Sequence, residues 1–327
     1  MMAASDRVTN ERGGVIDAPV QARPGQTTLG WIGTGVMGQS MVGRLREAGF
    51  EIVLTTRSRA KAELLLERGC RWADSPAAVA AAADVVFVMV GHPSDVHGVM
   101  FGDQGVMVGL RRGAILVDHT TSSPMLAVEI HAAAKARAVW SLDAPVSGGD
   151  RGAREGTLTV MVGGEAAPLE ALAECWRAVA GNVVACGGPG AGQRTKLVNQ
   201  IAIAGGMVGM CEALLFAHRA GLDVETTLRA ISGGAAGSWS LSNLAPRIVR
   251  GDFAPGFMVE HFVKDMRLAL DECRRLDLPL PGLALVESLY TALVAQGQER
   301  LGTQSLVLAL AQLAKHPWPV PPAAQVS

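Results

Sequence analysis

Short apolar runs alternate with helix-like segments over the first part of the chain, and this order predicts strands that alternate with helices. An α/β fold with a doubly wound, mainly parallel sheet is the arrangement that such an order favours. Ser75-Pro76 and Ser123-Pro124 supply start signals for two of the helices. The strands are expected at 28–32, 51–56, 84–90, 114–118, 138–142, 158–162 and 182–185, and the helices between them include 40–48, 77–83 and 125–136.

The pattern changes after the breaker cluster Gly187-Gly188-Pro189-Gly190. From there to about residue 313 the sequence favours helices, and we find no convincing alternating strand. The first of these helices is expected over about 192–220, because apolar residues recur at helical spacing and proline is absent. The chain is therefore expected to consist of a flexible tail (1–26), an α/β domain (27–190), an all-helical domain (191–316) and a proline-rich tail (317–327).

A glycine motif lies between the first predicted strand and the helix that follows it. In a dinucleotide site the first glycine makes a tight turn, the second lets the backbone approach the pyrophosphate, and the third lets the helix pack on the strand. The diphosphate then rests on the N–H groups at the start of the helix. A glycine-rich turn without a ligand does not explain three glycines at these offsets. Cofactor contacts are predicted for Gly33, Thr34, Gly35, Val36, Met37 and Gly38.

The second predicted strand ends in a basic segment. An NAD-binding unit usually has an acidic residue there, which holds the ribose 2′-hydroxyl. This chain instead has Thr56 and Arg57, then Ser58, Arg59 and Lys61. The alternative interpretation is a solvated basic turn that opens the next helix. Because this position discriminates between cofactors, we predict that NADP(H) is preferred over NAD(H), with Thr56, Arg57 and Ser58 as contacts.

Ligands of doubly wound sheets bind beyond the carboxyl ends of the strands. Three predicted loops lie there, at 90–93, 118–121 and 143–149, and the first of them begins with Val90. In the third loop, Ser147-Gly148-Gly149 combines a hydroxyl with successive glycine amides, which can cradle a carboxylate. A bare glycine-rich turn is the alternative.

A lysine stands near the start of the long predicted helix. Between Lys196 and Arg219 the only formal charge is Glu212. Lys196, Asn199 and Gln200 share a face, because residues three or four apart are neighbours on a helix. The lysine either extends its amine out to solvent from the helix end or is a partly buried amine whose pKa is lowered, so that it exchanges protons.

Composition narrows the class of protein. The 327 residues favour two domains, and a formal net charge of −1 gives no reason to expect nucleic acid or a membrane as a partner. Five scattered cysteines without C-x-x-C spacing indicate reduced thiols in a cytoplasmic protein. No signal peptide is recognised, the apolar run 201–211 is too short to span a membrane, and no metal site is predicted.

With these motifs in their order, the sequence resembles the β-hydroxyacid dehydrogenases, the family that contains 3-hydroxyisobutyrate dehydrogenase and tartronate semialdehyde reductase (2-hydroxy-3-oxopropionate reductase). The resemblance runs from about residue 28 to about residue 314. The motifs that carry it are Gly33-x-Gly35-x-Met37-Gly38, Asp118-x-Thr120-Thr121-x-x-Pro124, Asp143-Ala-Pro-Val-Ser-Gly-Gly149, Gly156-Thr-Leu158, Gly192-x-x-x-Lys196-x-x-Asn199-Gln200 and Lys264-Asp265.

The resemblance implies a Rossmann-like domain followed by an all-α domain, and it implies roles by position. Most members have asparagine where this chain has Gln200, and tartronate semialdehyde reductases resemble this chain in having glutamine there. The implied roles are catalysis for Lys196, cofactor binding for Val90, Thr121 and Lys264, and substrate binding for Thr121, Ser147, Gly148, Gly149, Asn199 and Gln200.

The implied activity is the NADP-dependent interconversion of a short 3-hydroxy acid and its semialdehyde, with a small carboxylate as substrate. Imine reductases resemble the family but usually lack the lysine, which argues against that activity. Another reductase of the same fold, acting on imines or sugar acids, and a non-catalytic NADP-binding module are the alternatives. Gly205 and Gly209 would let another helix approach closely, and a homo-oligomer, dimer or tetramer, is expected.

Overall fold

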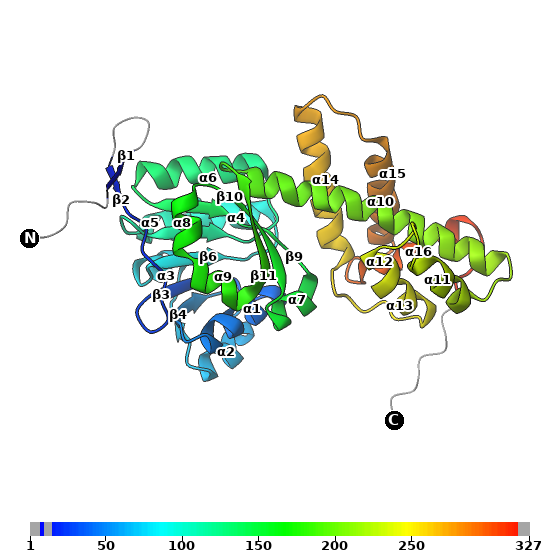
Figure 1. Ribbon diagram of the computed structural model, residues 1–327, viewed down its shortest axis with the longest axis horizontal. Helices are drawn as coiled ribbons and strands as arrows, with labels where there is room; N and C mark the ends of the chain where they lie inside the picture. Colours follow the sequence, from blue (N-terminus) through cyan, green and yellow to red (C-terminus); the bar gives the residue numbers. More distant parts are fainter. Residues whose placement is uncertain (1–6, 10–14, 320–327) are drawn as a thin grey trace, which may run out of the picture. The chain divides into compact units, whose positions relative to one another are not determined.

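A nine-stranded sheet is the centre of the first of two compact units, Met1–Lys196 and Leu197–Ser327, in the computed structural model (Figure 1). The structure describes residues 7–9 and 15–319. The strand order is β11-β10-β8-β7-β6-β3-β4-β5, and β9 pairs with β10. The strands from β8 to β5 in this order are parallel, whereas β10 is antiparallel to β8 and β9. Their bounds are β3 Thr28–Ile32, β4 Glu51–Thr55, β5 Arg71–Trp72, β6 Val85–Val88, β7 Ile115–Asp118, β8 Trp140–Asp143, β9 Val146–Ser147, β10 Leu158–Gly163 and β11 Ala180–Gly187.

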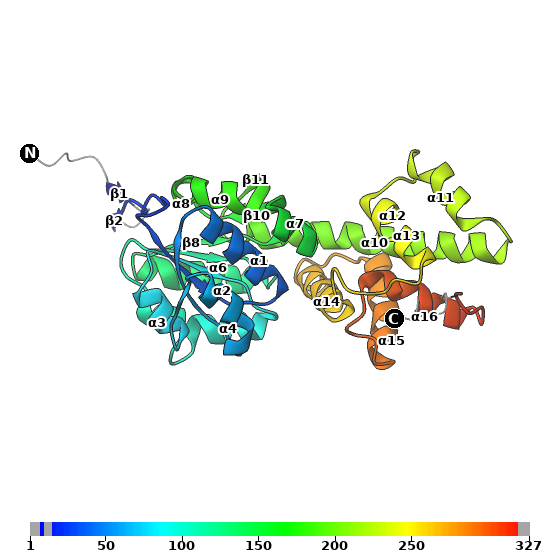
Figure 2. The ribbon, with the colours of Figure 1, turned by 90° about the horizontal axis from the view of Figure 1, so that it is seen from below.

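Helices cover both faces of this sheet, as a doubly wound fold requires (Figure 2). Apolar residues of α1, α2 and α9 pack against one face, and those of α3, α4, α5 and α6 against the other. The predicted fold class is confirmed. The bounds are α1 Val36–Glu47, η1 Arg59–Ala62, α2 Glu63–Glu67, α3 Pro76–Ala81, α4 Pro93–Phe101, α5 Val106–Gly109, α6 Pro124–Ala136, α7 Gly149–Glu155, α8 Ala166–Ala171 and α9 Ala173–Val179.

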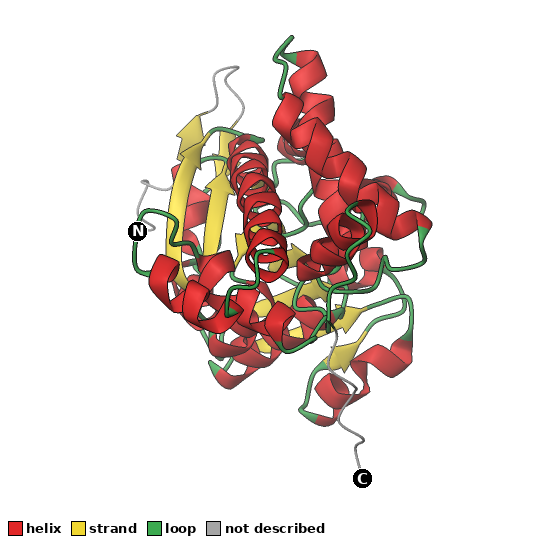
Figure 3. Ribbon diagram, turned by 90° about the vertical axis from the view of Figure 1, so that its right-hand side faces the viewer, coloured by secondary structure: helices red, strands yellow, loops and turns green. Residues whose placement is uncertain are grey.

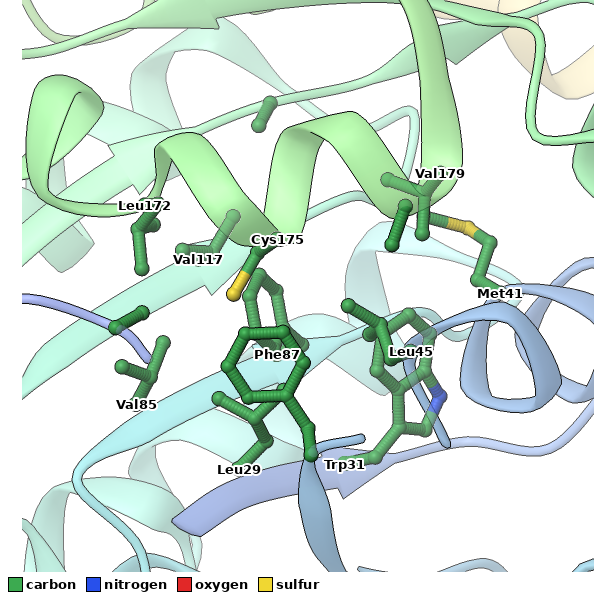
Figure 4. Packing of buried hydrophobic residues seen from close by; sticks show 14 of the residues in the cluster. Leu29, Trp31, Met41, Leu45, Val85, Phe87, Val117, Leu172, Cys175 and Val179 are labelled. Carbon is green, nitrogen blue, oxygen red and sulfur yellow. The ribbon is translucent and has the colours of Figure 1, made fainter. Parts of the chain in front are cut away.

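Aromatic rings fill the core under α1 and α9 (Figure 4). Trp31 of β3 and Phe87 of β6 are stacked, with ring centroids 5.6 Å apart. Both side chains are fully buried, and Cys175 of α9 packs over them. The Trp31 indole also donates a hydrogen bond of 2.8 Å to the Gly33 carbonyl. The core is thereby tied directly to the glycine turn that follows β3.

The second unit is all-helical over its described residues apart from one isolated bridge between Met258 and Gly302 (Figure 3). Its core gathers apolar side chains from each of its α-helices around the buried Phe262 and Tyr290, whose ring centroids lie 5.2 Å apart. The bounds are α10 Ala191–Arg219, α11 Val224–Ser232, α12 Trp239–Asn243, α13 Ala245–Val249, α14 Val259–Arg275, α15 Pro281–Ala295, η2 Thr303–Ser305 and α16 Leu306–Leu313.

Helix α10 is one helix of 29 residues, as the sequence predicts, and it contributes to both units. By length and apolar composition it could cross a membrane. Its side chains Leu197, Met207, Cys211 and Leu214 are buried in the core of the helical unit, whereas only 33% of its apolar 18-residue window is buried within the chain. One face of α10 therefore packs in the helical core, and the expectation that the apolar segment is too short to span a membrane does not hold for the whole helix.

Both predicted tails are partly wrong where the structure describes them. At the N-terminal end, 7–9 and 15–17 form an antiparallel pair, β1 (Arg7–Thr9) with β2 (Val15–Asp17), and Ala22 is buried, with its N–H bonded to the Ala171 carbonyl at 2.9 Å. At the other end, Trp318 is buried in the helical core. Expected tail residues 1–6, 10–14 and 320–327 lie outside the described part of the chain.

Candidate active site

The β3–α1 turn has the backbone geometry of a nucleotide cradle. Gly33 has φ +96°, and a Cβ there would lie 2.1 Å from the Met89 carbonyl oxygen. A Cβ on Gly38 would lie 2.2 Å from the Gly33 carbonyl oxygen. Gly35 differs, because its φ of −68° suits any residue and a Cβ there would have no heavy atom within 4 Å. Packing thus requires glycine at positions 33 and 38. Gly35 instead leaves open space at the N-terminus of α1, where a diphosphate fits.

A glutamine that the sequence analysis did not single out holds this turn. The Gln39 side chain donates to the Thr34 carbonyl at 3.2 Å and to the Lys61 carbonyl at 2.9 Å. The Thr34 N–H is 3.5 Å from the Thr56 hydroxyl. The glycine turn and the segment after β4 are therefore bonded to each other, so the two predicted cofactor-contact regions lie side by side.

The basic segment after β4 presents the exposed guanidinium of Arg57. The Arg57 side chain is 89% exposed and lies 3.4 Å from the Asp95 carboxylate of α4. Such an exposed pair contributes little stability, so the guanidinium is free to turn to a phosphate. Arg59 instead stacks on Trp72 at 5.1 Å. Arg57 and the exposed Ser58 thus stay the predicted contacts of a 2′-phosphate.

The loops after β6 and β7 are bonded together at the carboxyl edge of the sheet. The Val90 N–H donates to the Thr120 hydroxyl at 3.0 Å, and the Thr120 N–H donates to Asp118 at 2.9 Å. His119 is buried among Trp31, Phe87 and Trp176, and Nδ1 is 2.7 Å from the Ala144 carbonyl oxygen. Burial lowers the pKa of His119 to about 4, so this ring is neutral near pH 7.

The first turn of α10 is held by the loops that follow β7 and β8. The Asp143 carboxylate accepts the N–H groups of Gly190 and Gln193, each at 2.8 Å. Gln193 is fully buried, and its side chain accepts the Ser122 N–H at 2.9 Å and donates to the Thr120 carbonyl at 2.7 Å. Burial raises the pKa of Asp143, although the two backbone donors oppose that shift.

Lys196 follows on the next turn of this helix and is only 7% exposed. That burial favours a partly buried amine over one extended into solvent. In the helical unit, Gln200 is 2% exposed; its side chain accepts from Asn199 at 2.7 Å and donates to Asp265 at 2.6 Å. Asp265 also lies 3.1 Å from the Lys264 ammonium.

The Ser147-Gly148-Gly149 turn connects β9 to α7. Gly148 has φ +127° and Gly149 has φ +62°, a region that favours glycine. The conformation of the turn therefore accounts for both glycines. The half-buried Ser147 pairs with Thr159 of β10, which fixes its place at the sheet edge.

Sequence reasoning missed the roles of four residues: Asp143, Gln193, Gln39 and Asp95. Asp143 was recognised as part of a motif, but its capping of α10 depends on a contact across 47 and 50 positions. Gln193 carries one sequence clue, because it lies one helical turn before Lys196. Gln39 and Asp95 carry no distinguishing signal.

Comparison with known proteins agrees with this architecture. A family model described as the NAD binding domain of 6-phosphogluconate dehydrogenase matches residues 28–188. A second, described as NAD-binding of NADP-dependent 3-hydroxyisobutyrate dehydrogenase, matches residues 190–310.

Relatives match over nearly their whole length. The "probable 3-hydroxyisobutyrate dehydrogenase-like 1, mitochondrial" of Arabidopsis thaliana is 50% identical over 89% of this chain and 87% of its own. The 2-hydroxy-3-oxopropionate reductase of Escherichia coli is 36% identical over 88% of this chain and 98% of its own. The structure of Psf3 in complex with NADP+ and 2-OPP has a TM-score of 0.80 and 27% identity, and the match covers 86% of this chain and 99% of Psf3. The chain therefore belongs to the β-hydroxyacid dehydrogenase family of NAD(P)-dependent oxidoreductases.

Proposed function

We propose that this enzyme interconverts a short 3-hydroxy acid and its semialdehyde with NADP(H), and that Lys196 handles the proton. The observation that carries the proposal is the burial and position of Lys196. It lies one turn after the start of α10, and that start is hydrogen-bonded to loops at the carboxyl edge of the sheet. Ligands of a doubly wound sheet bind at that edge. When bound, the nicotinamide supplies or accepts a hydride.

The chemistry assigned to Lys196 follows from charge. During reduction, negative charge grows on the carbonyl oxygen of the substrate, and a protonated amine stabilises that oxygen and then gives it a proton. During oxidation, the neutral amine removes the hydroxyl proton. Low exposure excludes water from the amine and strengthens its interaction with the oxygen. Ser147 and the amides of Gly148 and Gly149 are proposed to hold the carboxylate, with Thr121 beside substrate and cofactor.

The helical unit contributes two further proposals. The Gln200 side chain is hydrogen-bonded to Asn199 and Asp265. We therefore propose that Gln200 orients the Asn199 amide, and that Asn199 is the residue that contacts the substrate. Lys264 is paired with Asp265 and is proposed to meet the cofactor.

A substrate screen tests the activity. Reduction of NADP+ is measured with 3-hydroxyisobutyrate, glycerate and sugar acids, and oxidation of NADPH with the matching semialdehydes and with cyclic imines. The proposal expects turnover of a short 3-hydroxy acid in one direction and its semialdehyde in the other. Turnover of imines or sugar acids alone would indicate the alternative reductases. Tight NADPH binding without turnover of any class would indicate a non-catalytic module.

Cofactor preference gives a direct prediction about Arg57. Replacing it with aspartate removes the exposed guanidinium and places a carboxylate that favours the ribose 2′-hydroxyl of NAD(H). We expect kcat/KM with NADPH to fall by about one to two orders of magnitude, the cost of a lost charge-assisted contact, while kcat/KM with NADH rises or holds.

The control is Arg68→Asp, which makes the same charge change at an exposed position of the same unit. It should leave the ratio of the two kcat/KM values unchanged. A wild-type enzyme that prefers NADH tenfold would refute the cofactor proposal.

Assembly gives another prediction. One face of α10 is exposed and nearly uncharged: Val198 is 66% and Phe216 is 72% exposed, and a Cβ on Gly205 or Gly209 would meet no heavy atom within 4 Å. Such a stripe on a long apolar helix indicates an interaction surface, and we propose that a second copy covers it in a dimer.

A cytoplasmic location stays a prediction.

Phe216→Glu should convert the dimer to monomer in sedimentation velocity at micromolar concentration, because it buries a carboxylate in the apolar contact. Leu313→Glu, at an equally exposed leucine of α16, is the matched control and should remain dimeric. A wild-type protein that sediments only as monomer would contradict the proposal.

A further inference from the structure

The side chain of Gln193 connects the start of α10 to the loop 120–122, and the proposed reaction needs these two segments in a fixed relative position. Its amide oxygen accepts the Ser122 N–H and its amide nitrogen donates to the Thr120 carbonyl, so both bonds clasp the backbone on either side of Thr121. The side chain has no exposed surface, and each bond is shorter than 3.0 Å. A bidentate amide of this kind fixes both the distance and the rotation of the helix relative to the loop.

Asp143 restrains the same helical turn through backbone N–H groups. Its two oxygens accept Gly190 and Gln193 N–H groups, which satisfies donors that a helix start would otherwise leave unpaired. This turn packs closely against its neighbours at Gly192. A Cβ there would lie 2.4 Å from the Met161 carbonyl oxygen and 2.5 Å from the Asp143 carbonyl oxygen. These contacts therefore fix the rotation of the start of α10 about its own axis, which we call its phase, relative to the edge of the sheet.

That phase sets the direction of Lys196, because a side chain three positions along a helix lies on nearly the same face. We infer that Gln193 is a positioning residue for the proton transfer: it locks the first turn of α10 to the loop 120–122, so that the Lys196 amine and Thr121 meet the substrate together. The inference rests on the proposed role of Lys196. Proton transfer is sensitive to such placement, and displacement of a reacting group by about 1 Å costs about 10²-fold in rate.

Gln193→Met tests this, because it preserves the length of the side chain and removes both hydrogen bonds. We expect kcat to fall by about 10- to 100-fold, with the dissociation constant of NADPH changed less than about threefold, since other groups hold the phosphates. Gln304→Met is the matched control: Gln304 is 1% exposed, and its side chain donates to the carbonyls of Asp252 and Ala254, each at 3.1 Å. Both variants should lose thermal stability, but only Gln193→Met should lose kcat.

Gln193→Glu is the second variant. A carboxylate still accepts the Ser122 N–H but faces the Thr120 carbonyl without a proton to donate, whereas the protonated acid makes both bonds. The ratio of its kcat to that of the wild type should therefore rise as pH falls. A ratio independent of pH would count against the inference.

The decisive measurement is the double variant with Lys196→Met. If Gln193 acts through the lysine, Gln193→Met should lower kcat less than about threefold further in the Lys196→Met background. Fully multiplicative losses, or a Gln193→Met enzyme that loses stability like Gln304→Met but keeps its kcat, would overturn the inference and leave the proposed function intact. A Lys196→Met enzyme with normal turnover would instead refute the proposed function.

Discussion

Replacement of Lys196 with methionine is expected to lower kcat by about two to four orders of magnitude, the usual contribution of a positioned general acid. Methionine keeps most of the stem volume, so the buried site is filled while the titrating amine is removed. The dissociation constant of NADPH should stay within about threefold, because the diphosphate is assigned to the β3–α1 turn. Single-turnover NADPH oxidation and fluorescence titration measure the two quantities separately.

Lys135→Met is the control for this experiment. Lys135 lies on α6 in the same unit, its side chain is 40% exposed, and it lies 3.6 Å from Glu165. Its replacement should leave kcat unchanged and lower the melting temperature little, because an exposed pair contributes little stability. Retention of more than about a tenth of wild-type kcat by Lys196→Met, well short of the expected general-acid contribution, would disprove the assigned role.

Sequence patterns predicted helices, strands and turns well where these elements depend on residues that are close together in the sequence. The spacing Gly33-x-Gly35-x-x-Gly38 located the turn between β3 and α1, and one contact behind this spacing is local, because a Cβ on Gly38 would meet the Gly33 carbonyl oxygen. The unbroken apolar periodicity after Gly190 predicted α10 nearly to its ends. The predicted strand 28–32 agrees exactly in length with β3.

Contacts between distant elements could not be predicted in the same way. Nothing near Arg57 in sequence reveals that Asp95 lies beside it, and the partner of Gln200 is 65 positions away. Phe262 is fully buried in the helical core, because the period of α14 turns it inward, and its partner Tyr290 belongs to another helix. Burial of Ala22 likewise depends on α8, which the strand pattern did not reveal.

The three glycines of the β3–α1 turn should respond differently to alanine, and this gives the second large effect. Gly38→Ala would place a Cβ 2.2 Å from the Gly33 carbonyl oxygen and 3.1 Å from the Trp31 indole nitrogen, so α1 must move away from the sheet. Overpacking of this kind typically costs about 1–3 kcal/mol. We expect a lower melting temperature from this cost. We also expect an increase of at least about tenfold in the dissociation constant of NADPH, because a displaced α1 no longer presents its first N–H groups to the diphosphate.

Gly35→Ala separates binding from folding. Its φ is compatible with alanine and its Cβ meets no protein atom within 4 Å, so the melting temperature of the free enzyme should not fall. If the cofactor diphosphate approaches the backbone there, the added methyl group must nevertheless weaken NADPH binding by at least about tenfold. Differential scanning fluorimetry without cofactor and isothermal titration with NADPH measure the two effects. Normal NADPH affinity in Gly35→Ala would show that the diphosphate does not lie against this turn, because no other atom of the chain stands in the way of the methyl group.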